Sequence, residues 1–244
     1  MPIQFMTPGH LAFSVEERVL RAGGERITYG DTTFVVAGRT QWWFGYEAVL
    51  KRVLDVVLAS LGLAASLPIW LVIVVAIKLD SPGPALFVQE RVGVHGRHFR
   101  FYKFRSMHVD AEARLAELRA QNEVDGPVFK MRKDPRISRI GALLRRTSLD
   151  ELPQLVNVLK GDMSMVGPRP PLPREVAQYR PGDIIRLSVK PGLTCLWQVR
   201  GRSTLSFDTW MEYDREYVRN LSLWLDLSIL VRTVWAVLSC RGAY

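Results

Sequence analysis

The longest uninterrupted hydrophobic segment of the chain runs from Val56 to Ile77. These 22 residues contain no charged side chain, and they are flanked by Lys51-Arg52 on one side and by Lys78 on the other. A run of this length is sufficient for a helix that enters the hydrocarbon core of a membrane. A buried core helix is the alternative, but core helices of that length normally carry a polar face. The pattern therefore favours a membrane helix.

Pro68 lies near the middle of this run, where a proline removes a backbone donor and breaks or kinks a helix. Ser66 is close enough to return a hydrogen bond to the carbonyls that the proline leaves free. Basic residues occur on both sides of the run, and positive charge marks the cytoplasmic side of a membrane protein. Those that follow it are Lys78, Arg91, Arg97, Arg100, Lys103 and Arg105. We therefore expect a helix–break–helix that enters the bilayer and returns, with a straight span as the alternative.

Shorter patterns predict an α+β, mostly helical fold for the rest of the chain. Alternating residues predict strands at 85–89 and 99–105, and two short ones within 26–36. Helices are expected at 110–122, at 139–146 with Leu143 and Leu144 facing inward, and from Ser148 to about Lys160, where Gly161 ends the helix. We divide the chain into an accessory segment (1–45), the membrane helix with its turn (46–84) and a cytoplasmic domain (85–244).

The segment 221–240 is apolar again, although Asp226 and Arg232 interrupt it. Trp224 and Trp235 suit the headgroup level of a membrane. We expect an amphipathic helix that lies in the membrane interface. A plain core-facing helix is the alternative.

The formal net charge of the 244-residue chain is +9, from 33 Lys and Arg against 24 Asp and Glu. Such a balance suits nucleic acid, an anionic membrane surface or phosphate-bearing substrates. Nucleic-acid binding conflicts with the long apolar run, and no recognised nucleic-acid motif is present. The two cysteines provide neither a disulfide framework nor a zinc site, which favours a reduced, cytosol-facing chain.

The densest group of chemically capable residues is Arg145-Arg-Thr-Ser-Leu-Asp-Glu-Leu-Pro-Gln154. Ser148 and Glu151 match a helix capping box, and Asp150 matches an acid in a first helical turn, so a structural role is one interpretation. Arginines just before a helix start, with its free N–H groups, also make a phosphate site. Two carboxylates among phosphates repel each other unless a cation such as Mg²⁺ mediates. An ionised Asp150 could attack phosphorus and form an acyl phosphate.

Further cations stand beside prolines and glycines downstream. In Gly167-Pro-Arg-Pro170 the prolines fix the backbone, so Arg169 is presented at low entropic cost. A surface arginine in a proline-rich turn is the alternative. Lys190-Pro-Gly-Leu-Thr194 and Arg200-Gly-Arg202 offer further phosphate contacts.

The sequence from about Lys51 to Tyr244 resembles the bacterial sugar transferases, the monotopic polyprenyl-phosphate phosphoglycosyl transferases that start capsule, exopolysaccharide and O-antigen assembly. The motifs that carry the resemblance occur in the family's order. They are Lys51-Arg-x-x-Asp55, Ile77-Lys-Leu-Asp-Ser-Pro-Gly-Pro84, Tyr102-Lys-Phe-Arg-Ser-Met107, Ser148-Leu-Asp-Glu-Leu-Pro-Gln154, Asn157-Val-Leu-Lys-Gly-Asp-Met-Ser164, Val166-Gly-Pro-Arg-Pro170, Lys190-Pro-Gly-Leu-Thr194 and Trp197-Gln-Val-Arg-Gly-Arg202. The chain departs from the family at Ser66-Leu67-Pro68, where Ser-Pro is frequent, and at Cys195, where glycine is common.

The resemblance implies a re-entrant helix broken at Pro68 and supported by Ser66, in a protein on the cytoplasmic face of the bacterial inner membrane. It implies that Asp150 is the nucleophile, which takes a sugar phosphate from a UDP-sugar and releases UMP. Glu151 would assist by holding Mg²⁺ together with Asp150 or by handling the proton. Undecaprenyl phosphate would then attack the phosphosugar–aspartyl intermediate. The expected substrate-binding residues are Lys103, Arg105, Arg145, Arg169 and Arg202.

The C-terminal Arg-Gly-Ala-Tyr resembles that of exopolysaccharide members of the family, so hexose-1-phosphate is the expected group. The expected partners are a UDP-sugar, undecaprenyl phosphate and membrane lipids, without nucleic acid; the oligomeric state is open, a homo-oligomer included. The rival hypothesis from another class is a non-enzymatic basic membrane anchor or scaffold. Magnesium-dependent release of UMP separates the two.

Overall fold

The computed structural model describes residues 25–30, 32–36, 49–201 and 205–239. Helices predominate, and the described strands form three two-stranded sheets, which confirms the expected α+β, mostly helical class. The strands are β1 (Glu25–Tyr29), β2 (Thr32–Val36), β3 (Leu86–Val92), β4 (His98–Phe104), β5 (Ser164–Val166) and β6 (Gly192–Thr194). The α-helices are α3 (Lys51–Asp80), α4 (Ala111–Leu118), α5 (Arg139–Thr147), α6 (Gln154–Lys160), α7 (Pro173–Val176), α8 (Leu196–Arg200), α9 (Phe207–Arg219) and α10 (Leu223–Leu238). The 3₁₀ turns are η2 (Val94–Gly96), η3 (Arg119–Gln121), η4 (Leu149–Glu151) and η5 (Pro181–Ser188).

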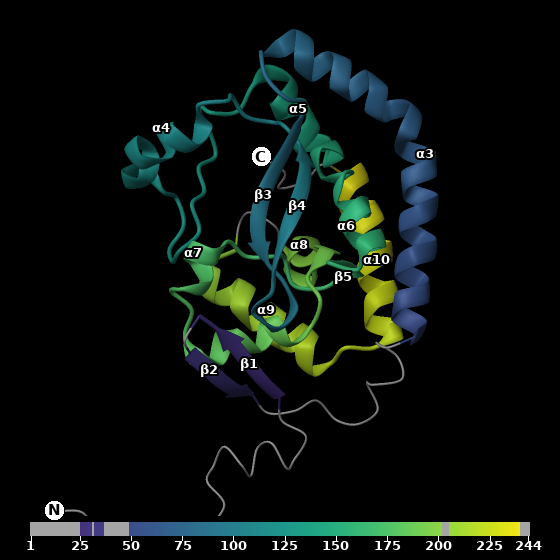
Figure 1. Cartoon of the computed structure of the whole chain (residues 1–244), viewed down its shortest axis with the longest axis vertical. Coiled ribbons are helices and arrows are strands. Elements are labelled where there is room, and N and C mark those ends of the chain that lie inside the picture. The colour runs from purple at the N-terminus through teal and green to yellow at the C-terminus, as the bar shows by residue number, and fades with distance from the viewer. Residues whose placement is uncertain (1–24, 31, 37–48, 202–204, 240–244) are drawn as a thin grey trace, which may run out of the picture.

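Helix α3 carries the hydrophobic run and remains one helix of 30 residues through Pro68. Figure 1 shows that α3 follows one edge of the molecule and then bends over its top. A proline inside a helix removes one backbone hydrogen bond and is an ordinary cause of such a bend. The expected helix–break–helix is therefore corrected to a single bent helix.

Ser66 does not form the expected hydrogen bond to the carbonyl oxygen that Pro68 leaves free. Its hydroxyl donates to the carbonyl oxygen of Leu63 at 3.1 Å, one residue before the carbonyl that Pro68 leaves free. The same hydroxyl accepts a hydrogen bond from Trp70 Nε1 at 3.1 Å. Trp70 in turn packs edge-on against Phe104, with ring centroids 5.1 Å apart. Ser66 thus links this part of α3 to strand β4 and does not replace the missing bond.

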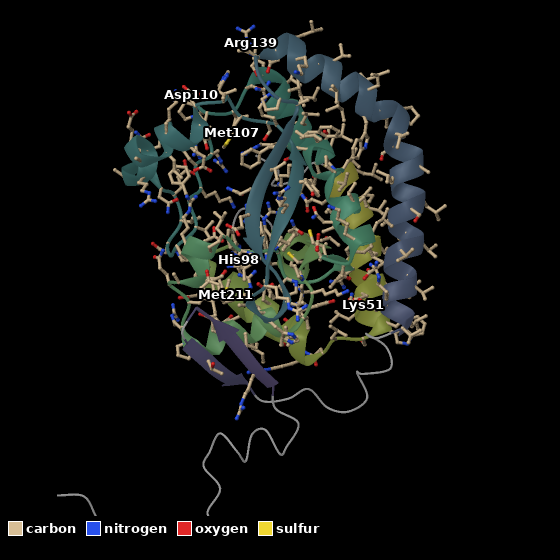
Figure 2. The ribbon with its side chains drawn as sticks, in the orientation of Figure 1. Lys51, His98, Met107, Asp110, Arg139 and Met211 are labelled. Atoms are coloured by element: carbon tan, nitrogen blue, oxygen red, sulfur yellow. The ribbon has the colours of Figure 1, made fainter. Side chains whose placement is uncertain are left out.

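The basic residues before the run are bound inside the protein. Lys51 is buried, forms an ion pair with Asp226 of α10 and donates to the carbonyl oxygen of Val166 at 2.9 Å. Arg52 donates to two carbonyl oxygens near the end of α6, at 2.6 and 2.7 Å. Figure 2 shows Lys51 at the foot of α3, where α10 passes. Because both cations are bound internally, they do not provide the free positive flank assumed in the sequence argument.

Helix α3 is nevertheless not a core helix. It is long and apolar enough to cross a membrane, and only 17% of its most apolar 18-residue window is buried. Its buried side faces α6, where Gly62 lets Leu155 approach: a Cβ at Gly62 would lie 3.3 Å from a Leu155 methyl group. The low burial excludes the alternative of a buried core helix.

Helix α10 has a buried side and an exposed side. Asp226 and Ile229 are buried against the domain. The opposite side exposes large hydrophobic side chains, namely Trp224, Val231, Val234, Trp235 and Leu238. One face of α10 therefore packs on the core, while the other presents an apolar surface.

The β3–β4 hairpin lies at the centre of the molecule in Figure 1, and its antiparallel register runs from Leu86 opposite Phe104 to Val92 opposite His98. Both of its strands were expected from alternation. Strands β5 and β6 pair in parallel, which brings two motif loops into contact. A Cβ at Gly167 would lie 2.3 Å from the Lys190 carbonyl oxygen, and one at Gly192 would lie 2.0 Å from the Gly167 nitrogen. The glycines of these two motifs are thus required for backbone packing.

The described part of the N-terminal segment packs on the domain. Strands β1 and β2 form the expected antiparallel hairpin. Ile27 is fully buried in one cluster with Val92, Ile184 and Leu187, and the Tyr29 hydroxyl donates to the Pro173 carbonyl oxygen at 3.1 Å. The hairpin therefore braces the strand and the loop that lead to the candidate site.

The short helices agree in part with expectation. Helix α4 and turn η3 occupy the predicted segment 110–122, and α5 occupies 139–147. Leu144 is buried in α5, as expected, but Leu143 is 56% exposed, so its inward placement was wrong. Residues 167–172 lie outside regular elements.

Candidate active site

The segment between α5 and α6 folds into two successive turns instead of one continuous helix. Ser148 ends α5 in the left-handed conformation (φ 60°), and its N–H bonds to carbonyl oxygens of the last turn. The 3₁₀ turn η4, Leu149–Glu151, follows, and α6 begins only at Gln154. The Ser148 side chain makes no capping hydrogen bond, so the expected capping box with Glu151 was wrong. Glu151 is therefore available to other partners.

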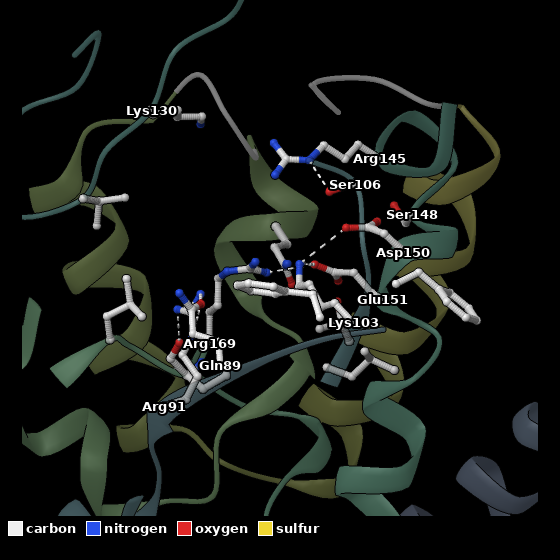
Figure 3. Close-up of a pocket in the computed structure, with 18 of the residues that line it drawn as sticks. Gln89, Arg91, Lys103, Ser106, Lys130, Arg145, Ser148, Asp150, Glu151 and Arg169 are labelled. Atoms are coloured by element: carbon white, nitrogen blue, oxygen red, sulfur yellow. Dashed lines mark hydrogen bonds and ion pairs between the residues drawn. The ribbon is translucent and has the colours of Figure 1, made fainter. Parts of the chain in front are cut away.

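Those partners are two cations that reach Glu151 from distant segments. Lys103 Nζ lies 2.8 Å from Glu151 Oε1 and 3.6 Å from Asp150 Oδ2. Arg169 Nη1 lies 3.1 Å from the same Glu151 oxygen. Figure 3 shows the Lys103 nitrogen beside both carboxylates and the Arg169 guanidinium reaching toward Glu151. The structure thus brings together four of the predicted site residues, and one of them, Lys103, contacts both carboxylates of the predicted dyad.

The two carboxyl groups of the dyad have opposite pKa shifts. Burial raises the pKa of Asp150, and the neighbouring Glu151 charge adds to this, while Lys103 opposes it. Burial also acts to raise the pKa of Glu151, but Lys103 and Arg169 outweigh it, so that pKa is lowered. Burial and the Glu151 charge therefore oppose ionisation of Asp150, whereas the surrounding cations Lys103, Arg145 and Arg169 favour it.

Arg145 completes the cluster from helix α5. Its Nε donates to Ser106 Oγ at 2.9 Å, directly after strand β4. Gly141 allows this approach, because a Cβ there would lie 1.9 Å from the Ser106 carbonyl oxygen. Burial lowers the pKa of Arg145, and the Asp150 charge opposes that shift. The second arginine, Arg146, is exposed and does not line the cavity described below.

The backbone that carries Arg169 is held at three successive carbonyl oxygens. Arg186 Nη2 donates to the carbonyl of Arg169 at 2.7 Å, and Arg91 Nη1 donates to that of Pro170 at 2.9 Å. The Val92 N–H donates to the carbonyl of Pro171 at 2.9 Å. Prolines have no N–H with which to hold this loop, so the donors from other segments fix it through its carbonyl oxygens. Arg169 is therefore presented from a rigid support, unlike a surface arginine in a turn.

One cavity of about 960 Å³ contains the dyad. Its polar part is lined by Arg91, Lys103, Lys130, Arg145, Asp150, Glu151 and Arg169. Lys130 was missed because it lies in an irregular loop without a motif. Burial, together with the nearby Arg169 charge, lowers the pKa of Lys130 to about 8. Figure 3 shows it across the cavity from Asp150.

Two predicted substrate-binding residues differ from the others. Arg105 lines the cavity, but it is buried and donates to the carbonyl oxygens of Ser81, at 2.7 Å, and Pro82. Its contacts therefore hold the turn that follows α3. Arg202 lies outside the described residues.

The carboxylates can be compared with what Mg²⁺ requires. Within the described part of the chain, no group of three or more His, Cys, Asp or Glu side chains lies close enough together to hold a metal ion by itself. Mg²⁺ is often held by one or two carboxylates together with substrate phosphates, and Asp150 and Glu151 both line the cavity. Among the described residues, the ion pair of Asp150 with Lys103 is at 3.6 Å, longer than a hydrogen bond, so a metal ion could replace this contact. The residues fit Mg²⁺ that binds together with a phosphate-bearing substrate.

Comparison with known proteins places this geometry in a family. The chain is 43% identical over 222 residues to the galactosyl transferase CpsE of Streptococcus agalactiae, which covers 91% of this chain and 49% of that protein. It is 45% identical over 202 residues to the undecaprenyl-phosphate galactose phosphotransferase of Salmonella typhimurium, and this match covers 80% of this chain and 42% of that protein. It is 39% identical over 198 residues to the exopolysaccharide production protein ExoY of Rhizobium meliloti, and this match covers 80% of this chain and 88% of that protein.

The chain spans about half the length of the first of these relatives, whereas it covers most of ExoY. The family model for bacterial sugar transferases matches residues 46–240. That range contains α3, the dyad and every cation of the cavity, and it leaves out the β1–β2 hairpin. The chain belongs to the bacterial sugar transferase family.

Proposed function

We propose that this protein moves a hexose-1-phosphate from a UDP-sugar to undecaprenyl phosphate and releases UMP. The observation that carries the proposal is the Asp150 carboxylate, set among Lys103, Arg145 and Arg169 in the wall of one cavity. The activities for which relatives are named support the same assignment, and one of them is a UDP-glucose:undecaprenyl-phosphate glucose-1-phosphate transferase of Escherichia coli. We further propose that the product begins an exopolysaccharide, capsule or O-antigen unit.

In the first half-reaction, an Asp150 oxygen attacks the phosphorus that carries the sugar. A phosphorus–oxygen bond forms to Asp150, the bond to the UMP oxygen breaks, and UMP leaves with that electron pair. Arg145 and Arg169 bind the phosphate oxygens as guanidinium forks, and their positions are set by Ser106 and by the held loop. Positioned cations of this kind stabilise the charge that spreads over the phosphoryl oxygens.

In the second half-reaction, a phosphate oxygen of undecaprenyl phosphate attacks the same phosphorus. The bond from phosphorus to Asp150 breaks, and the carboxylate is regenerated beside Lys103. Lys103 contacts both carboxylates, so it stabilises Asp150 as an anion before the reaction and after it. Mg²⁺ held by Asp150, Glu151 and the donor phosphates would supply further charge neutralisation.

We further propose that α3 is a re-entrant membrane helix and that the active site faces the cytoplasm. Both ends of α3 are bonded to one domain, through Lys51 with Asp226 at its start and through Arg105 with Ser81 at its end. A straight helix of 30 residues would separate those ends by about 45 Å, the thickness of a whole bilayer. The bend in α3 and the exposed apolar face of α10 also support a protein seated on one side of the membrane.

The decisive experiment looks for the covalent intermediate. Purified protein is incubated with Mg²⁺ and a panel of UDP-sugars in the absence of lipid acceptor. We expect UMP release in an amount equal to the enzyme and one sugar phosphate added to the peptide that contains Asp150. Asp150→Asn should fold and form no adduct, because an amide cannot form an acyl phosphate.

The matched control is Asp125→Asn, which makes the same chemical change at an exposed residue outside the cavity. That variant should form the adduct like the unmodified protein. Release of UMP by Asp150→Asn at the normal rate would refute the covalent mechanism. If no UDP-sugar yields UMP, the membrane-anchor hypothesis replaces the enzyme.

A further inference from the structure

The cavity that contains Asp150 continues beyond the cations as an apolar wall. This wall is built from α6, β6 and α10, with Leu58 of α3 also lining the cavity. Its apolar side chains are Leu155, Leu193, Leu230, Val234 and Val237. A nucleotide sugar has no aliphatic chain that would cover these aliphatic side chains.

Helix α10 presents one regular stripe to the cavity. The lining residues Leu230, Thr233, Val234 and Val237 are spaced by three or four positions, which places them on one face of a helix. Thr233 does not interrupt the apolar character of the wall. Its hydroxyl donates to the Ile229 carbonyl oxygen at 2.7 Å and lies 2.7 Å from the Thr194 hydroxyl, so both hydroxyls are satisfied within the protein.

The apolar half of the cavity adjoins the apolar surface of the molecule. Val234 lines the cavity and is also 61% exposed, so the wall and the outer face of α10 are continuous at this residue. Leu58 belongs to α3, which exposes many large hydrophobic side chains. The Lys51–Asp226 pair joins the first turns of α3 and α10. An apolar chain can therefore pass from the cavity to the surface of these helices without crossing a polar region.

We propose that this apolar half binds the isoprenoid units next to the phosphate of the acceptor lipid, and that α10 forms one wall of the acceptor site. The inference rests on the proposed function, which makes a polyprenyl phosphate the acceptor. The occupant is identified by its chemistry: a phosphate that meets Lys103, Arg145 and Arg169, joined to a long apolar chain that meets α10. The cationic side chains and the aliphatic side chains that line the cavity match the two parts of that molecule.

The test uses a matched pair of substitutions on α10. Val237→Trp places a large ring in the cavity wall, whereas Val231→Trp makes the same change on the outward face, at a residue that is 72% exposed and does not line the cavity. Both full-length variants are studied in lipid nanodiscs. Val234→Trp is a second cavity variant, in case Val237→Trp fails to fold.

Two half-reactions separate the acceptor site from the donor site. UMP release without acceptor should be unchanged in Val237→Trp, because the donor does not use the apolar wall. The apparent KM for undecaprenyl phosphate should rise about tenfold or more, as expected for the loss of one well-buried apolar contact. Val231→Trp should leave both values close to those of the unmodified protein. An equal loss in both half-reactions, or equal effects of the two tryptophans, would overturn the proposal.

A binding readout keeps the proposal testable if turnover fails. A polyprenyl phosphate that carries a diazirine on its first isoprenoid units is irradiated with the protein in the absence of donor. We expect the label on the α10 peptide, reduced in Val237→Trp and retained in Val231→Trp. Labels confined to other peptides would refute the acceptor site. If α10 is labelled but no UDP-sugar yields UMP, the proposed function is refuted, whereas the lipid-binding site on α10 is supported.

Discussion

Arg186 and Arg169 are joined by a hydrogen bond in which the Arg186 side chain donates to the backbone carbonyl oxygen of Arg169 at 2.7 Å. Arg186 is buried, and its guanidinium also pairs with the buried Asp214 at 2.8 Å and contacts the Tyr179 hydroxyl. The arginine that faces the dyad thus depends on a second arginine behind it. Sequence motifs did not single out Arg186, because its role arises only from the fold.

Replacement of Arg186 by lysine should weaken donor use without unfolding the protein. A lysine keeps the charge beside Asp214, but its single nitrogen cannot hold Asp214 and the Arg169 carbonyl together. We expect kcat/KM for the UDP-sugar to fall about tenfold, because small displacements of a phosphate-binding group are costly in rate. Arg180→Lys is the control, since Arg180 pairs with Asp208 at an exposed position. A normal kcat/KM in Arg186→Lys would show that Arg169 does not need this support.

The rate of adduct formation should have an acidic limb set by Asp150. Its pKa is raised by burial, so protonation begins at a higher pH than the ordinary value of about 4. Since only the ionised carboxylate is nucleophilic, the rate falls as the pH falls through the raised pKa. Lys103 opposes the shift, so Lys103→Met should move the limb to still higher pH. Stopped-flow or quench measurements of UMP release across pH give the position of the limb. An unmoved limb in the variant would contradict this account.

Donor binding should also have an alkaline limb set by Lys130. Its pKa is about 8, so the ammonium loses its charge as the pH rises through that value. If this cation helps to hold the donor phosphates, kcat/KM for the UDP-sugar falls above about pH 8. Lys130→Arg keeps its charge at every such pH and should flatten the limb. A limb that persists in Lys130→Arg would assign the decline to another group.

The sequence predicted the elements more reliably than their contacts. The apolar run of α3 and the alternation of β3 and β4 are local patterns, and the structure has all three elements. The capping box failed because Ser148 takes a left-handed conformation that ends α5, and a four-residue match cannot reveal that conformation. Lys51 was counted as a membrane-flanking charge, whereas its partner Asp226 lies 175 residues away. Contacts of that range depend on the tertiary fold.

The same limit applies to the site. Asp150, Glu151, Arg145 and Arg169 could be grouped from motifs, since arginines and carboxylates near a turn suggest phosphate chemistry. Arg105 belongs to the same set of motifs, yet its guanidinium holds the turn at Ser81. Lys130 lies in a loop whose sequence carries no phosphate-binding signal, so only the fold brings it to the cavity.

The Lys51–Asp226 pair should contribute strongly to stability. Both side chains are buried, and removal of one partner leaves an uncompensated charge. Lys51→Met and Asp226→Leu should each lower the free energy of unfolding by about 3–5 kcal/mol, and the double variant should lose less than the sum. Denaturation in detergent micelles measures the cycle. Additive losses would mean that the two residues act independently.

The topology of α3 gives the last prediction, and it follows from contacts at both ends of the helix. Lys51 binds α10 and β5 at the start, and Asp80 accepts a hydrogen bond from the Ile140 N–H at the end, at 3.2 Å. Both sets of contacts belong to one domain, which in the proposed topology lies on one side of the membrane. We therefore expect the residues before and after α3 to be accessible from the cytoplasm alone.

Single cysteines at Val49 and Glu90, in a variant without Cys195 and Cys240, test this directly. Val49 is 65% exposed, and Glu90 carries an exposed side chain. Both cysteines should react with a membrane-impermeant maleimide in inside-out vesicles and stay unlabelled in intact cells. Pro68→Leu restores the backbone hydrogen bond and removes the cause of the bend, so it should straighten α3 and bring a fraction of the molecules into a spanning state. That state breaks the contacts at one end of the helix, so the same variant should lose stability and activity together. Labelling of either cysteine from outside in the protein with Pro68 intact would establish a true span and refute the re-entrant helix.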